Sequence, residues 1–244
     1  MDDPSMLSGT IKAVTFDIVF AAAMAALAYA VFLWYPASRV EAVWITLAES
    51  LVIVLAGVAV MTRGRFSSQV DLKLITVPVT FGVLLYAAQW LTSYAPSFVW
   101  YTPPISWVIT GLLIYLPEGI IIAALVAVIE KPGSILMAMI PFYIISMVSY
   151  FNPIWTPFYF AWALAGEIIL GIGRAPLAAR AIGATLAVAV ADTFLASQYM
   201  LFNFGVYSPP ALNVLTGMEN VVFALVGAAI GYGIGIKARN AWKP

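Results

Sequence analysis

The sequence predicts an all-α fold, a polytopic bundle of about eight transmembrane helices. Of its 244 residues, 64% are hydrophobic and only 9% are charged, which is more apolar surface than a water-soluble chain of this length can bury. The apolar residues gather in runs long enough to cross about 30 Å of hydrocarbon as helices. Neither observation is typical of a soluble domain, so the chain is expected to work inside a bilayer.

The expected spans follow one another with short connections. The opening segment 1–8 is acidic and polar, and no removable signal peptide is expected there. A tight turn at 130–134 separates the fourth and fifth runs, and a short polar segment at 151–156 separates the fifth and sixth. Because the fifth and sixth runs are short, a bundle of six or seven spans is the alternative. In order, the eight runs are 14–36, 42–62, 74–93, 104–129, 134–150, 157–173, 181–200 and 212–236.

Basic residues predict the orientation of these spans. Ten of the eleven lysines and arginines fall at alternate ends of the eight runs, and Arg39 is the exception. Basic residues next to short loops are retained on the cytoplasmic side of a membrane. The expected protein therefore crosses the cell membrane several times, with both termini in the cytoplasm.

The residue types that are absent narrow the function. The chain has no cysteine and no histidine, so a metal centre, a thiol nucleophile or an imidazole base is not expected, and an enzyme is the least favoured class. Eleven acidic residues balance eleven basic ones, which gives no reason to expect nucleic acid. No glycine-rich nucleotide loop or cofactor motif is present, so ATP hydrolysis would need partner chains.

Acidic residues inside the predicted spans are the first candidates for a binding site. Each costs a few kcal/mol at mid-membrane unless it is neutral, solvated or partnered. Glu118 follows Pro117, whose missing amide allows a kink. The alternative is that these acids are protonated and join neighbouring helices by hydrogen bonds. The acids are Glu49, Glu118, Glu167, Asp192 and Glu219, and the neutral groups near the same outer side are Gln89, Asn152, Gln198, Asn203 and Asn220.

Aromatic residues crowd the loops on the side opposite to the basic residues. An interfacial belt of aromatic side chains is the ordinary explanation. The cytoplasmic loops hold few aromatics, however, and this asymmetry favours an outward-facing pocket for a flat ligand. The candidates from these loops are Trp155, Tyr159 and Tyr207.

Small residues at four-residue spacing mark two helices for close packing. Gly227, Gly231 and Gly235 form one stripe in the last span, and internal packing is the favoured explanation for it. Ala22, Ala26 and Ala30 form the other in the first span, where a partner subunit is an equal alternative.

The order of motifs between about 70 and 237 resembles the substrate-binding S components of energy-coupling factor transporters, in particular the YkoE-type group. The resemblance rests on the turn Glu130-Lys131-Pro132-Gly133-Ser134, on Asn152-Pro153, and on Ala165-Gly166-Glu167 in the next helix. Tyr199, Phe202 and the segment Tyr207-Ser208-Pro209 then precede the glycine-striped helix.

This resemblance implies two domains and a transport function. A six-helix S-component-like membrane domain would occupy 70–244, after an N-terminal two-helix extension at 1–69. The family binds thiamine or its hydroxymethylpyrimidine precursor and works with a transmembrane coupling subunit and two ATPase subunits. The expected function is therefore capture of such a vitamin. The alternatives are an ion-coupled secondary carrier and a non-catalytic structural subunit of a membrane complex.

Overall fold

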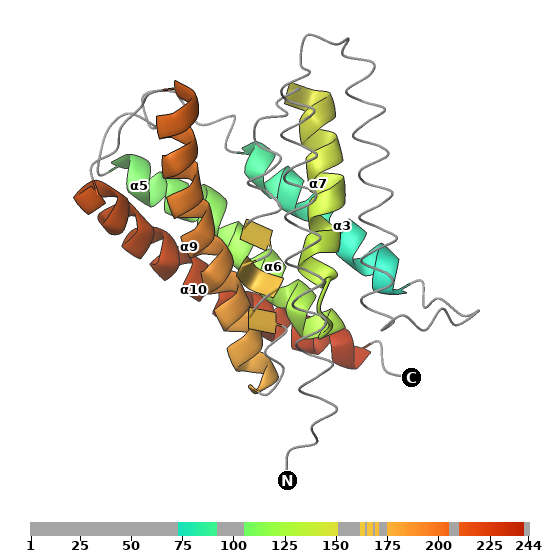
Figure 1. Ribbon diagram of the computed structural model, residues 1–244. Helices are drawn as coiled ribbons and strands as arrows, with labels where there is room; N and C mark the ends of the chain where they lie inside the picture. Colours follow the sequence, from blue (N-terminus) through green and yellow to red (C-terminus); the bar gives the residue numbers. More distant parts are fainter. Residues whose placement is uncertain are drawn as a thin grey trace, which may run out of the picture.

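The computed structural model describes residues 73–91, 105–150, 162–163, 165–167, 169–170, 175–204 and 210–241, and every regular element within them is helical (Figure 1). This confirms the all-α expectation for the described residues. The predicted hairpin at 1–69 lies outside them. The elements are α3 (Lys73–Trp90), α5 (Ile105–Thr110), η2 (Gly111–Tyr115), α6 (Leu116–Ile129), α7 (Ser134–Tyr150), α9 (Leu177–Phe204) and α10 (Pro210–Ala241).

Five of the eight predicted runs correspond to these helices, with ends that differ by a few residues. The described parts of the run 157–173 are helical as well. Two segments, Ile105–Ile129 and Leu215–Ala241, are long enough and apolar enough to cross a membrane. The largest differences are at the ends of α9 and α10, which extend beyond their predicted runs. At the C-terminal end of α10, polar and charged residues continue the helix.

The segment Ile105–Ile129 is one continuous helix with a π-turn in its middle. Pro117 has no amide to donate, and a regular α-helix would clash with its ring. The amide of Leu116 donates to the carbonyl of Gly111, five residues back, so the helix widens just before the proline. Pro117 then lies in the first turn of α6, where a missing amide is tolerated.

Helix α6 packs along α10 at very short distance, and α9 and α3 also contact it (Figure 1). A Cβ built on Gly231 would overlap the carbonyl of Ile120, and one on Gly235 would lie 2.6 Å from the carbonyl oxygen of Ala124. From the other side, a Cβ on Gly119 would lie 2.6 Å from the carbonyl oxygen of Ala224. Small residues therefore let the two backbones approach each other.

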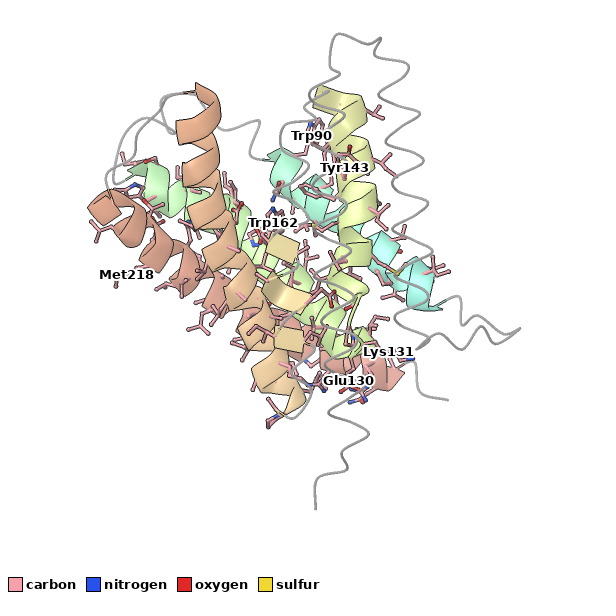
Figure 2. All side chains as sticks on the ribbon, in the orientation of Figure 1. Trp90, Glu130, Lys131, Tyr143, Trp162 and Met218 are labelled. Atoms are coloured by element: carbon pink, nitrogen blue, oxygen red, sulfur yellow. The ribbon has the colours of Figure 1, made fainter. Side chains whose placement is uncertain are left out.

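A second contact joins α3 to α7 and continues into the helical residues around Trp162. The rings of Tyr86 and Phe142 lie edge to face with centroids 5.8 Å apart, and those of Phe142 and Trp162 do the same at 6.2 Å. Trp162 is buried in the interior of the bundle (Figure 2). This aromatic chain fixes how α3, α7 and the Trp162 segment lie together.

One face of α10 presents large apolar side chains outward. Met218, which is 63% exposed, points away from the bundle (Figure 2). An apolar face of this length is costly in water and favourable in lipid. The other exposed members are Leu215, Val222, Leu225, Val226, Ile230 and Ile234.

An ion-pair cluster joins three helices at one end of the bundle. Glu130 ends α6 in a left-handed conformation with φ 57°, and its carboxylate lies 2.8 Å from the guanidinium of Arg239 on α10. Arg180 on α9 lies 4.0 Å from the same oxygen. Glu130 and the exposed Lys131 mark this end in Figure 2. Arg180 of α9, Arg239 of α10 and Lys131 of the turn after α6 thus gather at one end of the bundle.

Candidate functional site

A buried polar cluster lies where η2, α6, α9 and α10 meet. We use this name for Tyr115, Glu118, Asp192, Thr193 and Asn220. Tyr115 and Glu118 are three residues apart, so they share one side of the helix at the π-turn. Asp192 and Thr193 come from the middle of α9, and Asn220 comes from α10. Three separate stretches of the chain therefore contribute to one polar site.

Tyr115 and Asp192 form the firmest contact of the cluster. The hydroxyl of Tyr115 donates to Oδ2 of Asp192 at 2.7 Å. Tyr115 is buried and Asp192 is half-buried. A hydroxyl that donates to a carboxylate favours the charged acid and holds both side chains in place.

Asn220 and Thr193 form the second contact. The amide nitrogen of Asn220 donates to Oγ1 of Thr193 at 2.8 Å, and this hydroxyl donates in turn to the carbonyl of Ala189 at 2.9 Å. The carbonyl oxygen of the Asn220 side chain is buried and has no hydrogen-bond partner among the described residues. One acceptor of the cluster is therefore unused.

Glu118 is the least satisfied member of the cluster. Its side chain is buried, with 2% of the residue exposed, and neither carboxyl oxygen has a hydrogen-bond partner among the described residues. A negative charge on Asp192 disfavours a second negative charge on Glu118. A buried carboxyl group without a partner requires either a proton or a cation. Of the cluster, Glu118 is thus the member best suited to bind a positively charged group.

Glu219 precedes Asn220 on α10 and is half-buried. Its two carboxyl oxygens are shielded from solvent and have no hydrogen-bond partner among the described residues. The structure therefore places Asp192, Glu118 and Glu219 on three helices that contact one another. Of the predicted acids in the described part of the chain, these are the ones that lie in the same region.

Glu167 has a different position and a different environment. Its Oε2 accepts from the amide of Gly133 at 2.6 Å, and its Oε1 accepts from those of Ile135 and Leu136 at 2.6 and 3.1 Å. It therefore caps the first turn of α7, where backbone amides have no helical partner. This turn begins next to Glu130, about 18 Å along α6 from Glu118 at the rise of an α-helix. The structure does not bring Glu167 into the buried polar cluster.

The other predicted site residues lie largely outside the described part of the chain. Asn203 belongs to the last turn of α9, and its side chain is not described. The three glycines of the last span lie against α6, in the interior of the bundle. Outside the described residues are Asn152, Trp155, Tyr159 and Tyr207, and also Ala22, Ala26 and Ala30.

Sequence reasoning missed two members of the cluster, Tyr115 and Thr193. Both carried a signal, because Tyr115 precedes Glu118 by three residues and Thr193 follows Asp192 directly. A polar residue one turn from a buried acid is a natural hydrogen-bond partner for the acid itself or for a group that it contacts.

No group of three or more metal-ligating side chains occurs within the described ranges. Comparison of the chain with protein-family models, curated protein sequences and solved structures finds no match to any of them.

Proposed function

We propose that this chain is the substrate-binding membrane subunit of a vitamin importer of the energy-coupling factor type. It captures a thiamine- or pyrimidine-like ligand at the outer face. A transmembrane coupling subunit and two ATPase subunits deliver the ligand inward. The observation that carries the proposal is Glu118, a buried acid where three helices meet, whose two oxygens have no hydrogen-bond partner among the residues that the structure describes. The order of motifs in 70–237 supports the family.

The proposal includes eight spans in the cell membrane, with both termini in the cytoplasm and a two-helix extension before a six-helix core. Two apolar helices of membrane-spanning length and the apolar outward face of α10 support it. So does the position of Arg180, Arg239 and Lys131 at the end of the bundle that holds Glu130. The buried polar cluster lies away from this basic end, on the side from which a ligand would enter.

The cluster offers the chemistry that such a ligand requires. Glu118 accepts hydrogen bonds from an amino group or balances the charge of a thiazolium ring, and Asp192 adds a second negative charge nearby. The side-chain carbonyl of Asn220 accepts one further N–H group. In this proposal the predicted outer aromatics Trp155 and Tyr159 hold the flat ring by stacking.

Calorimetry on the purified protein tests the proposal. Thiamine or hydroxymethylpyrimidine should bind with a Kd below about 1 μM, which corresponds to roughly −8 kcal/mol. Glu118→Gln should weaken thiamine binding at least tenfold, because a neutral amide cannot balance a buried positive charge. Glu130→Gln is the matched control, since Glu130 pairs with arginine at the other end of α6. Wild-type protein that binds neither compound would refute the substrate assignment.

An ion-coupled secondary carrier is the second candidate. It is favoured by one observation: in the described structure neither Glu118 nor Asp192 is paired with a lysine or arginine. Such a site suits a small cation that moves without ATP. Proteoliposomes that contain this chain alone separate the candidates. Uptake of the ligand driven by an ion gradient would favour the carrier, whereas binding without uptake would favour the importer subunit.

A further inference from the structure

We infer that the buried polar cluster holds a proton on Glu118 when it is empty, and that a cationic ligand expels this proton to the outer water when it binds. The inference rests on the proposed function and adds regulation to the same site, because it makes capture of the ligand depend on pH. It is drawn from the balance of hydrogen-bond donors and acceptors in the cluster.

The cluster has more acceptors than donors. The hydroxyl of Tyr115 is used on Asp192, the hydroxyl of Thr193 on the carbonyl of Ala189, and one of the two amide hydrogens of Asn220 on Thr193. The second amide hydrogen of Asn220 could satisfy one further acceptor at most. Three buried acceptors then have no partner among the described residues: both oxygens of Glu118 and the side-chain oxygen of Asn220. Buried polar atoms in folded proteins are seldom left without a partner. The empty site therefore requires a further donor, and a proton is the smallest one.

The same contacts assign this proton to Glu118 rather than to Asp192. Asp192 accepts from the Tyr115 hydroxyl at 2.7 Å, and this bond stabilises its charged form. Glu118 is almost completely buried and accepts no hydrogen bond from the described residues, so none of them stabilises its charge. The negative charge of Asp192 nearby opposes a second one on Glu118. One charge and one proton on the pair satisfy both groups best.

The groups that surround the pair do not change this assignment. On α10 the titratable side chain next to Asn220 is Glu219, whose oxygens also have no hydrogen-bond partner in the described part of the chain. On η2 it is Tyr115, whose hydroxyl already donates to Asp192. The part of α3 with described side chains, also in contact with α6, carries Tyr86. Among the described residues, no lysine or arginine is available to neutralise the pair.

Binding is then an exchange in which charge balances. The protonated Glu118 and the cation give a Glu118 carboxylate paired with the cation, and the proton leaves to water. The buried charge is the same before and after, which avoids the cost of adding a net charge to a site of low polarity. The affinity for a cation should rise up to about tenfold per pH unit while Glu118 of the empty protein is still protonated. A neutral ligand releases no proton and shows no such rise.

Calorimetry with two ligands and two buffers tests the exchange. Thiamine carries a permanent positive charge, and hydroxymethylpyrimidine is neutral at pH 8. If binding releases protons, the heat measured in phosphate and in Tris differs, because the two buffers take up a proton with different enthalpies. We expect about one proton released per thiamine by wild type and by Glu130→Gln, and none by Glu118→Gln. We expect none with hydroxymethylpyrimidine.

The outcomes separate the inference from the function on which it rests. If thiamine binds to wild type with the same heat in both buffers, the exchange is wrong and the binding function stands. If Glu118→Gln still binds thiamine and releases a proton, the assignment to Glu118 is wrong. Failure of both ligands to bind refutes the proposed function and the exchange together.

Infrared spectroscopy of the ligand-free protein gives a second test that needs no ligand. A protonated carboxyl group absorbs at a higher frequency than a carboxylate. At pH 7 we expect a protonated-carboxyl band in wild type and Glu130→Gln that is reduced in Glu118→Gln. A band of equal size in all three proteins would show that Glu118 is ionised in the empty site, and this would overturn the inference.

Discussion

Replacement of Gly231 by alanine should separate α10 from α6. A Cβ at this position would lie 2.7 Å from both the carbonyl carbon and the Cα of Ile120, and closer still to its oxygen. Ordinary contact begins at 3.4 Å, and the atoms it meets belong to a backbone, which cannot rotate away. The two helices would therefore have to move apart by about 1 Å.

The cost of this movement follows from packing. An added methyl group that forces backbone shifts in a packed interior costs about 1–3 kcal/mol. Alanine also favours a helix over glycine by up to about 1 kcal/mol, which offsets part of the cost. The net loss expected for Gly231→Ala is about 1–2 kcal/mol of stability.

Gly233 on the same helix is the matched control. Nothing lies within 4 Å of a Cβ built on Gly233, so Gly233→Ala keeps the gain in helix propensity without an overlap. We therefore expect this variant to be as stable as wild type or up to about 1 kcal/mol more stable.

Unfolding by increasing SDS in mixed micelles measures the difference. The eight tryptophans of the chain report the transition by fluorescence. We expect the midpoint to fall for Gly231→Ala and to stay or rise for Gly233→Ala. Equal midpoints for the two variants would refute the close contact between α10 and α6.

Three further predictions concern the ends of the helices. Glu167→Ala should destabilise the protein by about 2–4 kcal/mol in the same assay, because three buried amides lose their acceptor. Glu167→Gln should cost less, and equal stability of wild type and Glu167→Ala would contradict the capping role. Arg239→Ala should cost less than about 1 kcal/mol, since its partner Glu130 is partly exposed, and a loss that persists in high salt would contradict this. In this cysteine-free chain, Lys131→Cys should react with a membrane-impermeant maleimide only from the cytoplasmic side, and labelling of intact cells would reverse the proposed orientation.

Most of the described fold could be predicted from the sequence because apolar runs of this length have few alternatives. The run 134–150 coincides with α7, and the run 104–129 starts one residue before α5 and ends with α6. Pro117 indicated a local irregularity, and the π-turn at Gly111–Tyr115 is its structural form. The ends of α9 and α10 were predicted less well, and at the C-terminal end of α10 the reason is that hydropathy does not mark where a helix continues in polar residues.

The acids show where the sequence was insufficient. Glu118 and Glu167 both occur once in an apolar helix next to a glycine, and both were predicted as site residues, although Pro117 singled out Glu118. The two acids differ in the hydrogen-bond donors that the tertiary structure brings to them. The turn after α6 and the start of α7 bring backbone amides to Glu167. Near Glu118, η2 contributes Tyr115, but the hydroxyl of Tyr115 already donates to Asp192. Hydrogen-bond partners from distant parts of the chain decide which acid is structural, and spacing along one helix does not contain that information.

The close packing of α10 on α6 and the unpartnered acid are parts of one arrangement. Gly119 follows Glu118 directly and lies against Ala224, and a Cβ on Gly227 would meet the backbone of Leu116, Gly119 and Ile120. The backbone on both sides of Glu118 is therefore in direct contact with α10, and the Glu118 side chain between them is buried. A buried acid with no hydrogen-bond partner among the described residues requires a proton or a cation. The glycines that pack the bundle thus also create the demand for a positive partner at Glu118.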